Sequence, residues 1–254
     1  MRLALLILWV LAPDLRALQL YERMQFQPAD PKDDAARRVV EVLLKKEHWV
    51  GAYSSLAEKF GHFPEGLVVT VDFDLPGDEL AQGGSRRTKG IVSFNLEKLA
   101  EAQRAIDEVL EKKRVAEARG QRFVMTVPPL KFERIIYHEL MHVLQQSYDA
   151  PTWFLEGMAQ LAGEDPNMMY GFALQRKKIR SIDVELTDRG EIYARGHFFW
   201  RWLESRHLAQ KVVELTVFQR RGWKESLTEA SGLSWESLVD TEREWSEKEL
   251  EKLR

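Results

Sequence analysis

The chain has 254 residues, of which 44% are hydrophobic, so it is long enough to bury a substantial core in one domain. Its 37 basic and 40 acidic residues give a net charge of -3, which offers no electrostatic footprint for nucleic acid. The absence of cysteine excludes disulfides and a lipoprotein anchor, and no phosphate-cradling glycine loop or nucleophile-elbow serine supports a nucleotide-dependent enzyme or a serine hydrolase.

The N-terminus has the layout of a secretory signal. Arg2 precedes an apolar run from Leu3 to Ala12, which has the usual length of a signal-peptide core and is too short to span a bilayer alone. We therefore expect residues 1–17 to be a signal peptide or an N-terminal anchor, and the protein to be exported to the periplasm or the extracellular space. A packed helix in a cytoplasmic protein is the alternative.

The next part of the chain predicts helices that cover a sheet. Apolar residues recur at helical spacing over residues 33–47, and residues 52–60 continue this helical layer. The runs 67–73 and 90–95 are rich in β-branched and aromatic residues and predict two strands. The glycine-rich stretch around residues 83–84 is expected to separate them.

A long charged helix follows. Residues 96–119 predict one helix that ends at Gly120, and residues 122–127 predict a further strand. Proline at the first position of a helix has no N–H to leave unpaired, so residues 128–129, both proline, can start the next helix. Apolar residues then recur at helical spacing over 132–144.

That helix carries the most informative motif of the chain, His138-Glu139-Leu140-Met141-His142. Residues four apart share one face of a helix, so both imidazoles can reach one metal ion. His138 and His142 are therefore candidate zinc ligands. Glu139, displaced around the helix, is the candidate general base that takes a proton from a metal-activated water. Two histidines on an ordinary core helix are the alternative.

A catalytic zinc site normally has three protein ligands, so a third ligand is expected. Residues 151–160 predict a turn followed by an apolar helix with one acid, Glu156. Burying an acid among apolar residues is costly unless a cation pairs with it, which makes Glu156 the candidate. Glu164 and Asp165 are the rivals, but they lie where the helix is expected to end in water.

His-Glu-x-x-His followed by Trp-x-x-Glu-Gly-x-Ala, with 13 residues between His142 and Glu156, resembles the small gluzincin-type zinc peptidases, called peptidase MA-like or minigluzincin domains. The resemblance spans roughly residues 35–250 and is strongest over 131–163. It implies a small twisted mixed sheet over an active-site helix and a glutamate helix, followed by a mostly helical C-terminal region. It also implies His138, His142 and Glu156 as ligands of one catalytic Zn²⁺, with Glu139 as the base.

Further expectations follow from this resemblance. Larger gluzincins often place an acid where this chain has Gln160, whose amide oxygen can still accept a hydrogen bond from a ligand imidazole. A sheet-edge strand binds the substrate in such enzymes, and the resemblance suggests Ile91–Asn95, with a plain internal strand as the alternative. Tyr193, or His197 as second choice, is expected to stabilise the oxyanion; the alternative is packing, which is the more common role of an aromatic residue or a histidine on such a helix.

The sequence thus predicts an α+β zinc metallopeptidase that hydrolyses peptide or protein substrates. Residues 18–254 are expected to form a single peptidase domain, with a helix-strand part over about 33–130, catalytic helices over 131–163 and a helical C-terminal part over 190–254. The alternative function is a zinc-binding, non-catalytic domain for peptide recognition or assembly. Glu139 argues against it, because a purely structural zinc site needs no base.

Overall fold

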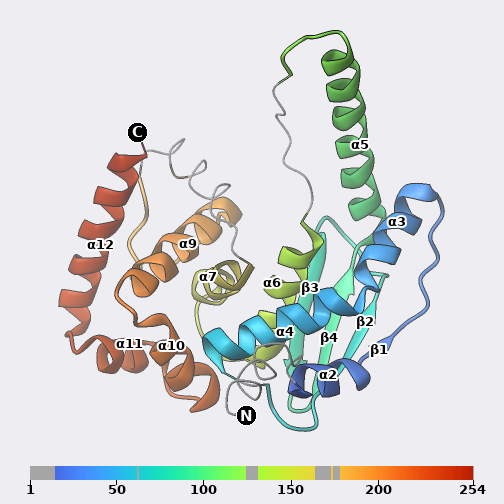
Figure 1. Cartoon of the computed structure of the whole chain (residues 1–254). Coiled ribbons are helices and arrows are strands. Elements are labelled where there is room, and N and C mark those ends of the chain that lie inside the picture. Colours follow the sequence, from blue (N-terminus) through green and yellow to red (C-terminus); the bar gives the residue numbers. More distant parts are fainter. Residues whose placement is uncertain (1–14, 62, 124–130, 164–172, 174–177, 254) are drawn as a thin grey trace, which may run out of the picture.

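The computed structural model describes residues 15–61, 63–123, 131–163, 173 and 178–253, and it confirms the predicted α+β class. Figure 1 shows one small sheet beside a larger set of helices. The sheet is mixed and has the order β1-β2-β4-β3, in which β1, β2 and β4 run parallel and β3 is antiparallel to β4. Its strands are β1 (Gln25–Phe26), β2 (Val68–Asp72), β3 (Ala81–Arg86) and β4 (Lys89–Phe94).

The two predicted strands, 67–73 and 90–95, are confirmed to within one residue at each end as β2 and β4. The glycine-rich stretch predicted to separate them is a strand of its own, β3. Because glycine is depleted in strands, the two glycines at 83–84 favoured a loop over a strand in the sequence-based prediction. Gly83 is needed here because a Cβ at this position would overlap the backbone of Glu139, so only glycine lets β3 lie this close to the next helix layer.

The expectation that Ile91–Asn95 forms a sheet edge is wrong. β4 pairs with β2 on one side and with β3 on the other, so its backbone groups are used within the sheet. Among the described residues, β3 is the edge strand instead. Asn95 N–H donates to Leu80 O, so by the alternation of antiparallel pairs the backbone groups of Ala81, Gly83 and Ser85 point away from β4, to the outer edge of β3.

One face of the sheet is buried beneath helices. The inward side chains of β2 and β4 are fully buried, and α4 (Lys46–Phe60) and α6 (Phe132–Gln145) pack on this side (Figure 1). The segment predicted as one helix over 33–47 is split, since α3 (Asp34–Leu43) ends before α4 begins. The indole N–H of Trp49 donates to Leu43 O at 2.6 Å and so satisfies a carbonyl at the break.

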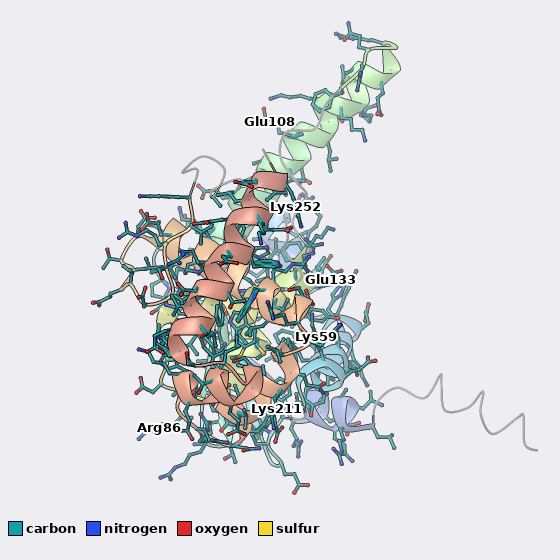
Figure 2. The ribbon with its side chains drawn as sticks, turned by 90° about the vertical axis from the view of Figure 1, so that its left-hand side faces the viewer. Lys59, Arg86, Glu108, Glu133, Lys211 and Lys252 are labelled. Atoms are coloured by element: carbon teal, nitrogen blue, oxygen red, sulfur yellow. The ribbon has the colours of Figure 1, made fainter. Side chains whose placement is uncertain are left out.

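α5 (Leu96–Ala118) confirms the predicted long helix, with Gly120 just after it at φ 70°. Its outer half extends past Glu108 away from the rest of the molecule (Figure 2). Arg122 and Phe123 lie in no strand, and the rest of the predicted strand 122–127 and the prolines 128–129 fall outside the described residues.

Most of the predicted signal segment, residues 1–14, also lies outside the described residues. Its last three residues begin α2 (Leu15–Glu22), in which Ala17 and Leu20 are buried in the core against α4. Leu15–Ala17 are therefore part of a packed helix. Among the helices of the described residues, none combines the length and the apolar character that crossing a bilayer requires.

The C-terminal region is helical, as predicted. α9 (Arg189–Ser205) packs along α7 (Thr152–Gly163) and contributes Phe199, Trp200 and Trp202 to the core. Around it lie α10 (Ala209–Val213), a π-helical turn η1 (Glu214–Phe218), α11 (Trp223–Ser231) and α12 (Trp235–Lys252). These helices form the side of the molecule away from the sheet (Figure 1).

Candidate metal centre

Two neighbouring helices carry the predicted ligands. α6 holds His138 and His142 one turn apart, and α7 holds Glu156. Gln146 and Ser147 end α6 with φ values of 50° and 54°, which reverses the chain so that α7 packs back along α6. Ser85 of β3 holds this reversal in place, because its hydroxyl donates to Val143 O at 2.6 Å and its carbonyl accepts from the Ser147 hydroxyl at 2.9 Å.

The three predicted ligands meet at one point. His138 Nε2 lies 3.2 Å from His142 Nε2 and 3.3 Å from Glu156 Oε2, and His142 Nε2 lies 3.6 Å from the same oxygen. Within the part of the chain that the structure describes, these residues form the only group of three or more His, Cys, Asp or Glu side chains that can hold a metal ion. The rivals Glu164 and Asp165 lie outside that part.

The carboxylate of Glu156 and the imidazole of His142 stabilise each other's charged forms. Burial disfavours the charged form of Glu156, but contacts with both histidines and their charges hold its pKa well below the usual range. Burial likewise opposes the charged form of His142, yet the contact with Glu156 and the charges of Glu156 and Glu139 raise its pKa to about 9. Glu156 Oε2 is buried and receives no well-formed hydrogen bond from the described part of the chain, as is expected of an oxygen that binds a cation.

The residue that orients His142 is Gln145 and not Gln160. His142 Nδ1 lies 2.8 Å from Gln145 Oε1, and Gln145 Nε2 donates to Leu155 O of α7 at 2.8 Å. Gln160 Oε1 is buried and makes no hydrogen bond with the described residues, so the expected contact is not formed. Gln145 is three residues after His142 on the same helix face, and this spacing was the signal in the sequence that could have identified it.

Glu139 lies beside the ligands on the sheet side. It is 6% exposed, and burial raises its pKa, while the charges of His138 and His142 and a hydrogen bond from the Gly83 backbone work in the opposite direction. A carboxyl group whose pKa is raised in this way is a better proton acceptor than an exposed one. The edge strand β3 therefore contacts the candidate base directly.

Of the two candidates on α9, Tyr193 is the one that contacts the cluster. Burial, followed by the charge of the neighbouring Glu156, raises the pKa of Tyr193 to about 12, and the guanidinium carbon of Arg189 lies 5.6 Å from the centre of its ring. The side chain is therefore a neutral hydroxyl donor at neutral pH. Burial and the charge of Arg201 lower the pKa of His197 to about 4, so its imidazole is neutral and not the imidazolium that oxyanion stabilisation would use.

Two glycines bring Tyr193 to Glu156. At the crossing of α7 and α9, a Cβ on Gly157 would overlap the backbone of Gly196, and a Cβ on Gly196 would overlap the carbonyl of Trp153. The absence of side chains lets the two helices touch backbone to backbone. Glu156 precedes one glycine and Tyr193 lies three residues before the other, so this contact sets their separation.

Gly196→Ala is expected to lower the free energy of unfolding by about 1 to 3 kcal/mol, because the added methyl group must push two packed backbones apart. The control is Gly51→Ala in α4, where a new Cβ meets nothing within 4 Å and alanine gains up to about 1 kcal/mol of helix propensity. Urea unfolding of both variants measures the difference. A Gly196→Ala protein as stable as wild type contradicts the close crossing.

The buried His197 is expected to make the stability of the protein depend on pH. The pKa of His197 in the folded protein, about 4, is below its unfolded value of 6.5, so its contribution to stability is present above pH 6.5 and is lost as the pH falls towards 4. This difference between the pKa values of the folded and unfolded states corresponds to about 3 kcal/mol of stability. We expect His197→Gln to show a smaller loss of stability than wild type between pH 6.5 and 4.5 in urea titrations. Equal losses in both proteins contradict a buried neutral imidazole.

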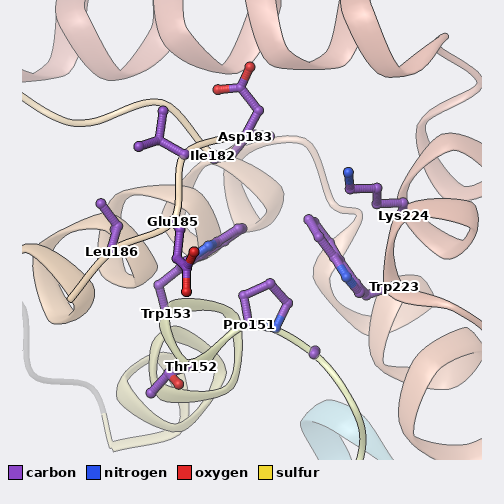
Figure 3. A pocket seen from close by; sticks show the side chains of 11 residues that line it. Pro151, Thr152, Trp153, Ile182, Asp183, Glu185, Leu186, Trp223 and Lys224 are labelled. Atoms are coloured by element: carbon purple, nitrogen blue, oxygen red, sulfur yellow. The ribbon is translucent and has the colours of Figure 1, made fainter.

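One cavity among the described residues is separate from the ligand cluster. It has a volume of about 430 Å³ and lies at the start of α7, between Trp153, the segment from Ile182 to Leu186, and Trp223 (Figure 3). None of the residues that line it belongs to the His138, His142 and Glu156 cluster. It therefore takes no part in the candidate centre.

No protein-family model, no curated protein and no solved structure matches this chain. Residues, distances and burial thus carry the functional argument. They establish a three-residue group that can hold a metal ion, with a buried glutamate on one side and a tyrosine hydroxyl on the other.

Proposed function

We propose that this protein is a zinc-dependent peptidase whose metal ion is held by His138, His142 and Glu156. One observation carries the proposal. Zinc lies about 2.0 to 2.2 Å from its nitrogen and oxygen ligands, and a tetrahedron of that size has edges of roughly 3.3 to 3.6 Å. The three donor atoms are 3.2, 3.3 and 3.6 Å apart.

The donor set supports zinc as the metal and catalysis as the role. Two imidazoles and one carboxylate suit Zn²⁺, and three protein ligands leave a fourth position open for water. A structural zinc site usually closes that position with a protein ligand. When bound, zinc lowers the pKa of a water molecule and polarises a carbonyl group.

The residues around the cluster supply the remaining chemistry. Glu139, buried and with a raised pKa, accepts a proton from the attacking water and passes it to the leaving amine. The neutral hydroxyl of Tyr193 donates a hydrogen bond to the oxygen that becomes negative as water adds to the carbonyl. Gln145 fixes the orientation of His142 and joins it to the backbone of α7.

The outer edge of β3 is the place where an extended peptide can add to the sheet. At Gly83 and Ser85 this edge contacts Glu139 and Ser147, and the backbone groups of Ala81 point to the same edge. Main-chain hydrogen bonds at such an edge hold peptides of many sequences. β3 therefore takes the substrate-binding role that the resemblance assigned to Ile91–Asn95.

The test is cleavage of a diverse peptide library by the purified full chain. We expect cleavage with one equivalent of Zn²⁺, loss of cleavage after treatment with a chelator, and recovery when zinc is added back. If the zinc-loaded protein binds peptides of the library but cleaves none, the non-catalytic recognition domain replaces the peptidase.

A further inference from the structure

The guanidinium of Arg189 lies one side chain away from the ligand cluster. Arg189 is the first residue of α9, one turn before Tyr193, and its guanidinium carbon is 5.6 Å from the centre of the Tyr193 ring. Both side chains also lie close enough to Glu156 for its charge to act on them. These contacts place a positive charge beside the centre in which the proposed hydrolysis takes place.

The carboxylate that pairs with Arg189 is exchangeable. Arg189 Nη2 lies 3.5 Å from Glu79 Oε1, which is longer than a well-formed bond between charged groups, and the two side chains are 62% and 49% exposed. Exposed ion pairs of this kind contribute little to stability. A guanidinium has five N–H donors, so its contacts with Glu79 and Tyr193 leave donors for a third partner.

Glu79 approaches from the other side of the centre. It lies two residues before β3, the edge strand whose Gly83 backbone contacts Glu139. A peptide bound along β3 and across the cluster therefore passes the point where Glu79 and Arg189 meet. A carboxylate on that peptide can take the place of Glu79, because the planar guanidinium binds carboxylates with two parallel hydrogen bonds.

We propose that Arg189 makes this site selective for peptides that carry a carboxylate within about two residues of the scissile bond. Only the Tyr193 side chain separates Arg189 from Glu156. Each residue of an extended peptide spans at most about 3.6 Å, so a carboxylate that reaches Arg189 lies within about two residues of the bond at the metal. The inference rests on the proposed peptidase function. The carboxylate is either the free C-terminus of the substrate or an Asp or Glu side chain.

Matched peptides separate these two sources. One pair differs only in Glu or Gln beside the scissile bond, and a second pair differs only in a free or amidated C-terminus one residue from it. For wild type we expect kcat/KM to be roughly 10- to 100-fold higher for the charged member of at least one pair, the size expected for a hydrogen bond to a charged group. The preferred pair identifies the source.

Three variants test whether Arg189 causes the preference. Arg189→Gln is expected to bring the ratio of charged to neutral substrate close to one, and Glu79→Gln to raise it because the competing carboxylate is gone. Arg243→Gln is the control, since Arg243 has a similar exposed pair with Asp240 on α12 and should leave the ratio unchanged. The ratio cancels any effect of Arg189 on catalysis through Tyr193.

Binding to zinc-loaded Glu139→Gln protein distinguishes failure of the inference from failure of the proposed function. If no peptide is cleaved but the charged peptides bind more tightly in an Arg189-dependent way, hydrolysis fails and carboxylate recognition stands. If peptides are cleaved with a ratio near one in wild type and in Arg189→Gln, the inference is overturned while the peptidase stands. If charged and neutral peptides are neither cleaved nor distinguished in binding, the inference is overturned as well.

Discussion

Glu139→Gln is expected to lower peptide hydrolysis by at least about 100-fold while zinc stays bound. General base catalysis typically contributes about 10²- to 10⁴-fold to an enzymatic rate, and glutamine cannot accept the proton. The substitution keeps the size of the side chain, and Glu139 is not one of the three ligands that meet at the cluster. The turnover number should therefore fall while the metal content does not change.

The control for this variant is Glu133→Gln on the same helix. Glu133 is half-exposed in the first turn of α6 and lies 3.3 Å from His48, away from the ligand cluster. Its replacement should leave the turnover number within about twofold of wild type. If Glu139→Gln retains full activity with zinc bound, another group acts as the base and the mechanism proposed here is wrong.

Glu242→Ala is expected to lower the free energy of unfolding by about 3 to 5 kcal/mol. Glu242 and Arg195 form an ion pair between α12 and α9 in which both side chains are almost fully buried. Burial disfavours the charge and lowers the pKa of Arg195, while Glu242 favours it. Removal of the carboxylate leaves the guanidinium buried without its counter-charge.

The damage should extend to the candidate metal centre, because Arg195 lies two residues after Tyr193 on α9. The control is Asp240→Ala on the same helix, which breaks an exposed pair with Arg243 and should change stability by less than about 0.5 kcal/mol. Urea unfolding measures both. Replacing both partners, as in Arg195→Met with Glu242→Leu, should recover most of the loss. Equal stability of Glu242→Ala and Asp240→Ala contradicts a buried ion pair.

The parts of the molecule that follow from local pattern were predictable. His138 and His142 share a helix face by their spacing alone, and the lone acid in an apolar helix identified Glu156. The long helix α5 and strands β2 and β4 follow from periodicity and propensity. Each of these features is decided within about 20 residues of chain.

The features that were missed depend on contacts between distant segments. β3 is a strand although it contains two glycines. Glycine is present at position 83 because this residue lies against the backbone of Glu139, where a Cβ would not fit. The same holds for the crossing of Gly157 with Gly196, which places Tyr193 beside Glu156. No local pattern encodes a close approach of two backbones. The helical part was predicted to begin at residue 190, and α9 begins at Arg189 because the Asp188 side chain caps it.

Zinc content tests the central claim most directly. We expect one zinc ion per chain in wild type after dialysis against a weak chelator, and severe metal loss in His138→Ala, His142→Ala and Glu156→Ala. Glu164→Ala, the nearest rival ligand in the sequence, should retain the metal. Zinc retained by Glu156→Ala but lost from Glu164→Ala would move the third ligand, and a wild-type chain that binds no zinc would contradict the account as a whole.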